Sequence, residues 1–135
     1  MLRRLRSWWR RREPEPLSSW FLVRWDASAF HVDARPPGRE AWGVSIQWEA
    51  ITRVCFEAES YSLSDAIYVF TRGRAESYAI PVDAGGGHEF WDELVRRGLF
   101  DAELAARAMG AVDGVFCWPE LDAEGRGRRP TTRCS

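Results

Sequence analysis

The segment of residues 41–48, AWGVSIQW, alternates apolar and polar side chains more regularly than any other part of the chain. Successive side chains of a β-strand point to opposite faces, so a period of two predicts a strand with one buried face and one solvated face. The apolar face is expected to carry Trp42, Val44, Ile46 and Trp48. We therefore expect the fold to be built on a sheet whose core face includes these side chains.

Other segments have the length and composition of strands and are separated by turn residues. Residues 20–26 and 29–34 are predicted to form a hairpin, and further strands are predicted at 52–58, 66–70 and 77–82. Six strands joined by short turns make a curved, mostly antiparallel sheet.

The hydrophobic period changes near His88. Residues 88–97 place apolar side chains on one face of a helix that Gly98 ends, and residues 101–109 form a second helix that Asp101 can cap. The spacing within the first helix predicts two i, i+4 ion pairs, Asp92–Arg96 and Glu93–Arg97. Residues 115–119 are expected to form a last short strand or a docking strip.

The chain of 135 residues is long enough for one domain with a core of its own. Two prolines in EPEPLS separate a basic amphipathic arm and linker, residues 1–18, from a single α+β domain at residues 19–119. Residues 120–135 are predicted to be a disordered polar tail.

The order of these elements resembles the small bacterial pleckstrin-homology-like domains and their GRAM-type relatives. The resemblance covers residues 20–97 and rests on WEAITRV from Trp48, IYVF from Ile67, YAIP from Tyr78 and FWDEL from Phe90. It implies an α+β fold, a pleckstrin-homology-like roll or barrel of about six strands followed by two C-terminal helices. It also implies a binding role rather than a catalytic one. The chain departs from the family at residues 99–119 and in the short, acidic first hairpin turn, where a phosphoinositide loop is not expected.

The three cysteines, Cys55, Cys117 and Cys134, match neither a disulfide framework nor paired zinc-ligand spacing. We expect reduced thiols in a cytoplasmic protein, with Cys55 on the opposite sheet face from Val54 and Phe56. Without an apolar run of roughly 18 residues, no membrane-spanning helix or signal peptide is predicted.

Charge is distributed unevenly along the chain. Residues 1–12 contain six arginines, whereas residues 13–120 contain nine arginines and eighteen acidic residues. On a helical wheel of about 100° per residue, the apolar residues of the arm gather on one side. Such a helix can lie on an anionic membrane, with tryptophans at head-group depth. The predicted membrane-binding residues are Leu2, Arg3, Arg4, Leu5, Arg6, Trp8, Trp9, Arg10 and Arg11.

Three interpretations of the arm remain open: a solubilising tail, a membrane anchor and a nucleic-acid contact. The acidic body disfavours nucleic acid, because it would repel a second contact with a polyanion. The first functional hypothesis is a non-enzymatic cytoplasmic binding domain, held at the inner membrane surface by the arm. The alternative is a protein-interaction module, of the immunity or regulatory type, that binds a basic partner through its acidic body.

Catalytic, metal and cofactor chemistry is not predicted. His31 is placed on the outer face of a strand and His88 at a helix start, without partners at metal-ligand spacing. The serines of SYSLSD lack a histidine nearby in sequence. The segment GGGHEF is either a flexible connector or a set of backbone donors for an anion at a helix start.

One exposed patch is predicted on the first hairpin. Trp20 and Leu22 share a strand face with Arg24, and an exposed aromatic and aliphatic pair is typical of a protein-binding or dimer surface.

Overall fold

The computed structural model describes residues 16–59 and 65–120 of the chain, which form seven β-strands and three α-helices. In chain order these elements are α2 (Leu17–Trp20), β1 (Phe21–Trp25), β2 (Ala29–Ala34), β3 (Trp42–Gln47), the 3₁₀ turn η1 (Trp48–Ala50), β4 (Ile51–Ala58), β5 (Ala66–Thr71), β6 (Tyr78–Pro81), α3 (Gly87–Arg96), α4 (Ala102–Met109) and β7 (Gly114–Trp118). The predicted α+β class is confirmed, and α2 and η1 are elements that the sequence patterns did not predict.

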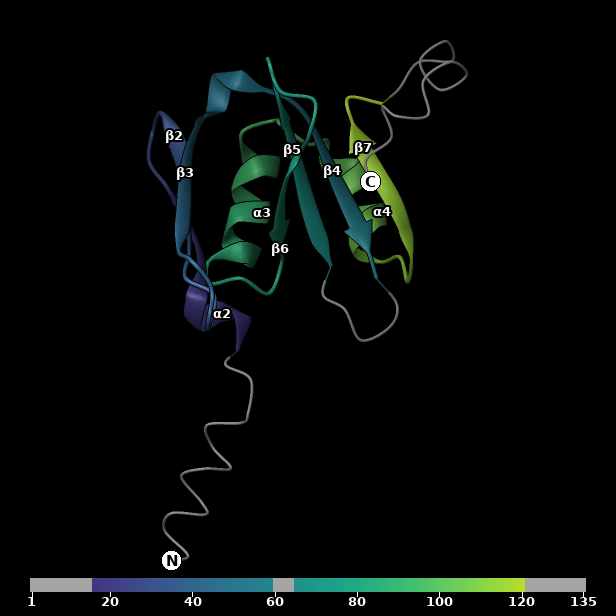
Figure 1. Cartoon of the computed structure of the whole chain (residues 1–135). Coiled ribbons are helices and arrows are strands. Elements are labelled where there is room, and N and C mark those ends of the chain that lie inside the picture. The colour runs from purple at the N-terminus through teal and green to yellow at the C-terminus, as the bar shows by residue number, and fades with distance from the viewer. Residues whose placement is uncertain (1–15, 60–64, 121–135) are drawn as a thin grey trace, which may run out of the picture.

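The strands form two antiparallel sheets rather than one. Sheet A has the order β1-β2-β3, and sheet B has the order β6-β5-β4-β7. The chain passes from one sheet to the other at η1, between β3 and β4. Figure 1 shows α3 between the two sheets, with α4 beside β4 and β7. Residues 115–119, predicted as a strand or a docking strip, largely form β7, which pairs with β4.

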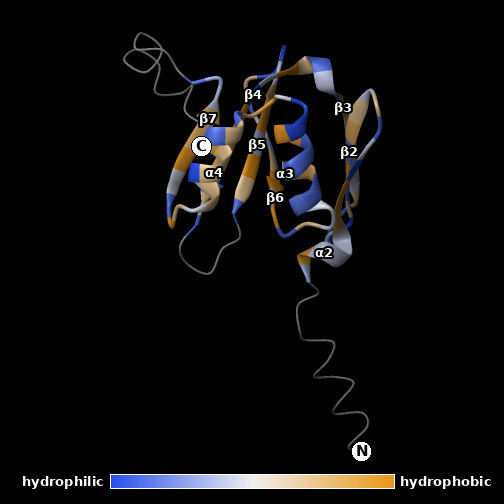
Figure 2. Cartoon of the chain, turned by 180° about the vertical axis from the view of Figure 1, so that it is seen from behind, coloured by the Kyte–Doolittle hydropathy of each residue, from blue (hydrophilic) through white to orange (hydrophobic). Residues whose placement is uncertain are grey.

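The helix α3 joins the sheets through large aromatic side chains. Phe90 faces sheet A, where its ring lies 4.7 Å from that of Phe30, and Trp91 faces sheet B, where its ring lies 4.7 Å from that of Phe56. Offset and tilted ring pairs at this separation are favourable. The polar side of α3 is turned outward, as the hydropathy colours show (Figure 2). One amphipathic helix therefore fills the space between both sheets.

The alternating strand β3 keeps only part of its predicted core face buried. Ile46 and Trp48 are buried and Val44 is half-buried, but Trp42 is 48% exposed. Trp42 lies at the start of β3 and packs edge-on against Phe21, with ring centroids 5.9 Å apart. The prediction that Trp42 belongs to the core was wrong, because the sheet's interior does not reach the end of this strand.

The predicted residues at the helix ends are confirmed, whereas one of the two predicted ion pairs of α3 is not formed. Gly98, after α3, has a φ of 76°, and the Asp101 carboxylate accepts the Leu104 N–H at 2.9 Å at the start of α4. Glu93 pairs with Arg97, as predicted, but it also pairs with Arg96. These two guanidinium groups, Arg96 first, lower the pKa of Glu93. The predicted Asp92–Arg96 pair is replaced, because the longer side chain of Glu93 reaches both arginines.

The three glycines at the start of α3, Gly85, Gly86 and Gly87, are closely packed. A Cβ on Gly86 would lie 2.3 Å from the Val23 carbonyl oxygen, and one on Gly87 would lie 2.2 Å from that of Val82. Gly85 donates its N–H to the Phe21 carbonyl and accepts the Val23 N–H, each at 2.8 Å, so this loop covers the edge of β1. The glycines therefore allow close backbone packing, and the interpretation as a flexible connector was wrong.

Candidate functional site

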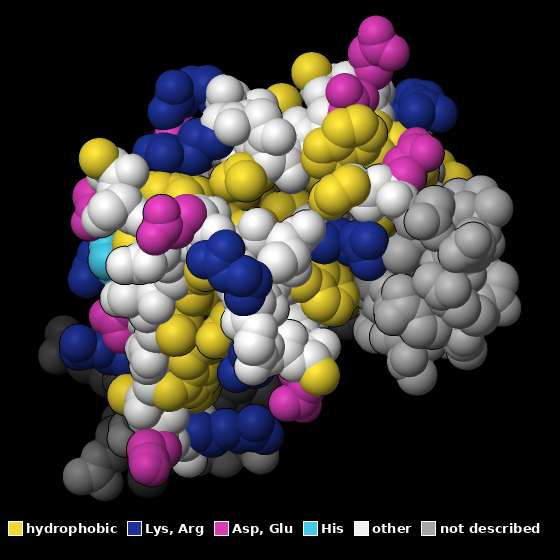
Figure 3. Space-filling view, turned by 90° about the horizontal axis from the view of Figure 1, so that it is seen from above, with side chains coloured by type: hydrophobic (Ala, Val, Ile, Leu, Met, Phe, Trp, Pro, Cys, Tyr) yellow, Lys and Arg dark blue, Asp and Glu magenta, His cyan; other side chains and the backbone are white. Residues whose placement is uncertain are grey.

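A pocket of about 490 Å³ lies where sheet A approaches the hairpin of β5 and β6. Its walls come from the turn between β1 and β2, the end of β3, η1 and the facing ends of β5 and β6. The lining residues are Ser28, Ala29, Ser45, Ile46, Gln47, Ala50, Thr71, Arg72 and Tyr78. Seen from above, arginine side chains lie near the middle of the molecule as well as at its rim, and acidic side chains lie mainly at the rim (Figure 3).

Most of the polar residues that line the pocket carry groups that can donate hydrogen bonds, although the hydroxyls of Ser28 and Ser45 are already bonded to Asp26 and His31. Four lining residues carry a hydroxyl group, Gln47 adds an amide, and Arg72 adds a guanidinium. None of the lining residues named above has a carboxylate. Arg74 lies over the Tyr78 ring, with its guanidinium carbon 4.2 Å from the ring centroid, and brings a second positive charge close to the pocket. The donor set and the charge favour an anionic ligand.

Asp26 organises the turn beside the pocket. Its Oδ1 accepts the N–H groups of Ser28 and Ala29, at 2.9 and 3.0 Å, and the Ser28 hydroxyl at 3.0 Å. This is the local bonding by which an aspartate stabilises a tight turn. The Asp26 carbonyl accepts the Trp48 indole N–H at 2.9 Å and the Arg97 guanidinium at 3.3 Å. The turn is thereby tied to η1 and to the end of α3.

His31 links this turn to the pocket wall. Its Nε2 lies 3.0 Å from Asp26 Oδ2, and its Nδ1 lies 2.7 Å from Ser45 Oγ. The β2–β3 register places His31 directly opposite Ser45, and the outer sheet face leaves the His31 side chain 26% exposed. Asp26, His31 and Ser45, which we call the polar relay, thus form a continuous hydrogen-bonded chain from the turn to the pocket.

Electrostatics determine which atoms of the polar relay donate. Hydrogen bonds from His31, and then from the Ser28 and Ala29 N–H groups and the Ser28 hydroxyl, hold the pKa of Asp26 well below its usual range. An ionised carboxylate can only accept, so His31 Nε2 must carry the proton. In a neutral imidazole, Nδ1 then has no proton and accepts the Ser45 O–H.

The polar relay was not predicted from the sequence. His31 and Ser45 were each assigned to a solvated strand face, and the structure confirms that position for both. Their contact depends on the pairing of β2 with β3 across a separation of 14 residues. The alternation of each strand is visible in the sequence, but the register that brings the two residues together is not.

The predicted site residues lie elsewhere. The membrane-binding residues, 2–11, fall outside the described part of the chain. Leu22 is 42% exposed and Arg24 is also exposed, on the outer face of β1, whereas Trp20 belongs to α2 and packs partly against the core. Leu22 and Arg24 are thus the exposed members of the predicted patch, Trp20 is half-buried, and binding of a partner by this patch stays a prediction.

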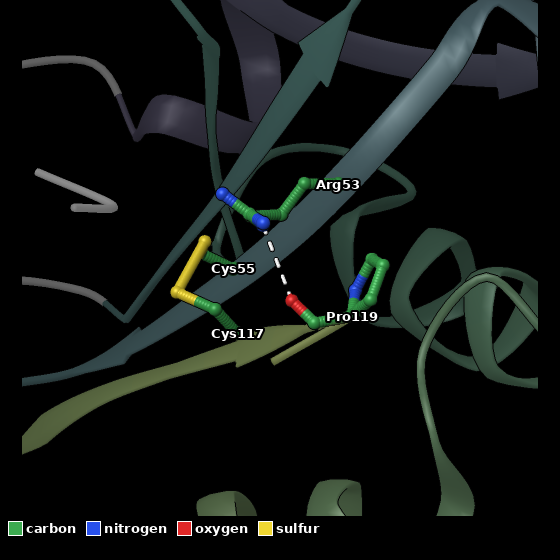
Figure 4. The surroundings of a disulfide bond; sticks show 4 residues. All are labelled: Arg53, Cys55, Cys117 and Pro119. Atoms are coloured by element: carbon green, nitrogen blue, oxygen red, sulfur yellow. Dashed lines mark hydrogen bonds between the residues drawn. A yellow bond between two sulfur atoms is a disulfide. The ribbon is translucent and has the colours of Figure 1, made fainter. Parts of the chain in front are cut away.

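The structure pairs two of the three cysteines. Cys55 on β4 and Cys117 on β7 are directly opposite in the sheet and form a disulfide (Figure 4). Beside it, Arg53 donates from Nε to the Pro119 carbonyl at 3.2 Å. The expectation of a reduced Cys55 thiol was wrong, since residues 62 positions apart meet only through the pairing of β4 with β7. Cys134 lies outside the described residues.

The same outer face of sheet B carries a hydrogen-bonded tyrosine. The Tyr68 hydroxyl donates to Glu57 Oε1 at 2.7 Å. Burial, together with this hydrogen bond and the nearby negative charge of Glu57, raises the pKa of Tyr68 to about 12. The Tyr68 hydroxyl therefore remains a hydrogen-bond donor to Glu57 well above neutral pH.

Metal-ligand clustering and membrane-spanning helices are both missing from the described segments. No three histidine, cysteine, aspartate or glutamate side chains there are grouped to hold a metal ion. None of the helices between residues 16 and 120 that the structure describes is long and apolar enough to cross a bilayer. No family model, curated protein or solved structure matches the chain.

Proposed function

We propose that the chain is a non-enzymatic binding domain whose pocket holds a small oxyanion group, such as a phosphate. The supporting observation is the single guanidinium of Arg72 among hydroxyl and amide donors, in a pocket without a carboxylate among its lining residues. An arginine can bind two oxygens of one oxyanion, and neutral donors can bind the others.

Reversible binding is favoured over catalysis at this site. Serine, histidine and aspartate also form the catalytic group of serine hydrolases. In such enzymes, however, the serine bonds Nε2 of the histidine and the aspartate bonds Nδ1, whereas here Ser45 bonds Nδ1 of His31 and Asp26 bonds Nε2. Ser45 is exposed on its strand, and His31 is half-buried. The polar relay is therefore assigned to ligand binding.

We further propose that the two sheets and α3 are an open variant of a pleckstrin-homology-like roll. Sheets of three and four strands, with a helix following the sixth strand, support this assignment. The pairing of β7 with β4 after two helices is an addition to that plan. In this proposal the oxyanion is either free in solution or part of a lipid head group, and the arm at residues 1–18 binds the anionic membrane surface.

The pocket is tested by titrating the full chain with sulfate and with inorganic phosphate while recording amide shifts by NMR. The shifts are expected at Ser45, Gln47, Thr71 and Arg72. Arg72→Gln should weaken binding roughly tenfold or more, because a charge-assisted hydrogen bond contributes about 1.5–3 kcal/mol. Arg39→Gln, an exposed arginine in the loop between β2 and β3, is the matched control. Equal weakening of anion binding by both substitutions would refute the proposal that this pocket binds the anion.

Vesicle flotation distinguishes the two possible sources of the oxyanion, a lipid head group and a free anion in solution. The full chain should float with vesicles that contain phosphatidylglycerol and not with pure phosphatidylcholine, and a chain beginning at Leu17 should fail to float. Flotation that is lost with Arg72→Gln identifies a lipid head group as the ligand. Flotation that survives Arg72→Gln, with phosphate binding lost, identifies a free anion.

A protein partner is the second candidate function. Residues 13–120 carry eighteen acidic residues against nine arginines, and this excess of negative charge is complementary to a basic surface. Removal of residues 1–16 should leave such binding intact, which separates it from membrane docking.

A further inference from the structure

We propose that the pocket binds its oxyanion in a proton-linked manner, because protonation of His31 converts Ser45 from a hydrogen-bond acceptor into a donor toward the ligand. The inference rests on the proposed oxyanion-binding function and adds its regulation. It follows from the two hydrogen bonds of one imidazole ring, to Asp26 at 3.0 Å and to Ser45 at 2.7 Å.

In the neutral state, His31 accepts a hydrogen bond from the Ser45 hydroxyl, so that this O–H group is not available to a ligand. Nε2–H donates to the Asp26 carboxylate, so Nδ1 accepts from the Ser45 hydroxyl. The lone pairs of Ser45 Oγ are then the groups available to the pocket that this residue lines. Lone pairs repel the oxygens of an anion, so this state opposes binding at Ser45.

In the protonated state the direction of the second hydrogen bond reverses. Both ring nitrogens of the imidazolium donate, so Nδ1–H donates to Ser45 Oγ. The Ser45 O–H becomes available to donate to an anion, and the ring adds a positive charge next to the pocket. The Asp26 bond at Nε2 is the same in both states and holds the ring in place.

The surroundings of His31 contain few other charges. Arg24 on β1 is its cross-strand neighbour, Asp26 is its turn partner, and Asp33 is the next residue on the same face of β2. On β3, the facing Ser45 is not titratable. Histidine is the class of side chain whose charge ordinarily changes between about pH 5 and about pH 8, which sets the pH range of the test.

The test is a sulfate titration of the full chain at about pH 5.5 and about pH 8, at constant ionic strength, because sulfate does not titrate in this range. Binding should be about tenfold tighter at the lower pH, or about 1.4 kcal/mol. His31→Gln should bind with equal affinity at both values. His88→Gln, which removes the only other histidine, should keep the full difference.

The reversal at Ser45 is separated from simple charge attraction by a third variant. Ser45→Ala keeps the imidazole charge but has no hydroxyl, so it should lose most of the pH dependence. An unchanged pH dependence in Ser45→Ala would overturn the proposal, and so would a pH-independent affinity in the unmodified chain. If sulfate fails to bind at either pH, the oxyanion pocket fails as well. If binding depends on Arg72 and not on pH, only the proton linkage fails.

The tautomer can be measured without a ligand. A long-range ¹H–¹⁵N correlation spectrum at about pH 8 should show the His31 proton on Nε2. A proton on Nδ1 would contradict the proposed direction of the hydrogen bonds.

Discussion

Asp26, an exposed residue, makes three kinds of contact: it stabilises its own turn, it bonds His31, and it links the turn to the end of α3. Its carboxylate accepts bonds from His31, Ser28 and Ala29, and its carbonyl accepts bonds from Trp48 and Arg97. Short polar side chains often stabilise turns in this way. Here the same carboxylate also fixes the His31 proton on Nε2, so that Nδ1 accepts the hydroxyl of Ser45 in the pocket wall.

The depressed pKa of Asp26 predicts an acid-dependent loss of stability. A carboxylate with a lower pKa in the folded chain stabilises that chain above its unfolded pKa, about 4, and the contribution is lost as pH falls below that value. Asp26→Asn should therefore lower the free energy of unfolding near pH 7 and should reduce its decrease between about pH 5 and about pH 2. Denaturant unfolding across this range measures both effects. An equal decrease in the variant and the unmodified chain would contradict the prediction.

At the scale of elements, the loop before α3 can pack closely against β1 only because its glycines have no side chains. Gly86 has a φ of 81° and lies against the Val23 carbonyl, whereas Gly73 has a φ of 76° and no atom within 4 Å of the position that a Cβ would take. Gly73→Ala should cost only the left-handed backbone penalty of about 1–2 kcal/mol. Gly86→Ala should cost at least about 3 kcal/mol, because the backbone of β1 or of the loop must also move. Urea unfolding compares the two variants, and equal costs would exclude the packing explanation.

At the scale of the whole molecule, the disulfide joins the last strand to the middle of sheet B. Cys55 and Cys117 enclose a loop that contains β5, β6, α3 and α4. Cross-linking a loop of this size restricts the unfolded chain and can stabilise the fold by about 4 kcal/mol. We expect reduction to lower the melting temperature without altering the sulfate affinity, because no residue that lines the pocket lies on β4 or β7, the two strands that the disulfide joins.

Thiol counting provides the control for this prediction. The Cys134→Ser variant should contain no free thiol before reduction and two after it, with the same loss of stability on reduction as the unmodified chain. Two free thiols before reduction would show that the pair is not bonded. Disulfides persist mainly in oxidising compartments, so a bonded pair would also count against the predicted cytoplasmic location.

Local order along the chain determined the elements themselves. The boundaries of β2 match the predicted strand at 29–34. As predicted, Gly98 lies just after the end of α3, and Asp101 caps the start of α4. Each of these features depends on residues within a few positions of one another, whose alternation, helical period and capping chemistry are visible in the sequence.

Tertiary structure decided which distant residues meet. The contacts His31–Ser45 and Cys55–Cys117 depend on strand register, and a shift of one residue would turn each side chain to the other face. Trp42 is exposed although it follows the apolar alternation, because exposure depends on where the opposite sheet ends. The sequence by itself therefore determined the strands, the helices and their caps, whereas the pocket, the polar relay and the disulfide arise from long-range pairing, whose free energy depends on the packing of the whole chain.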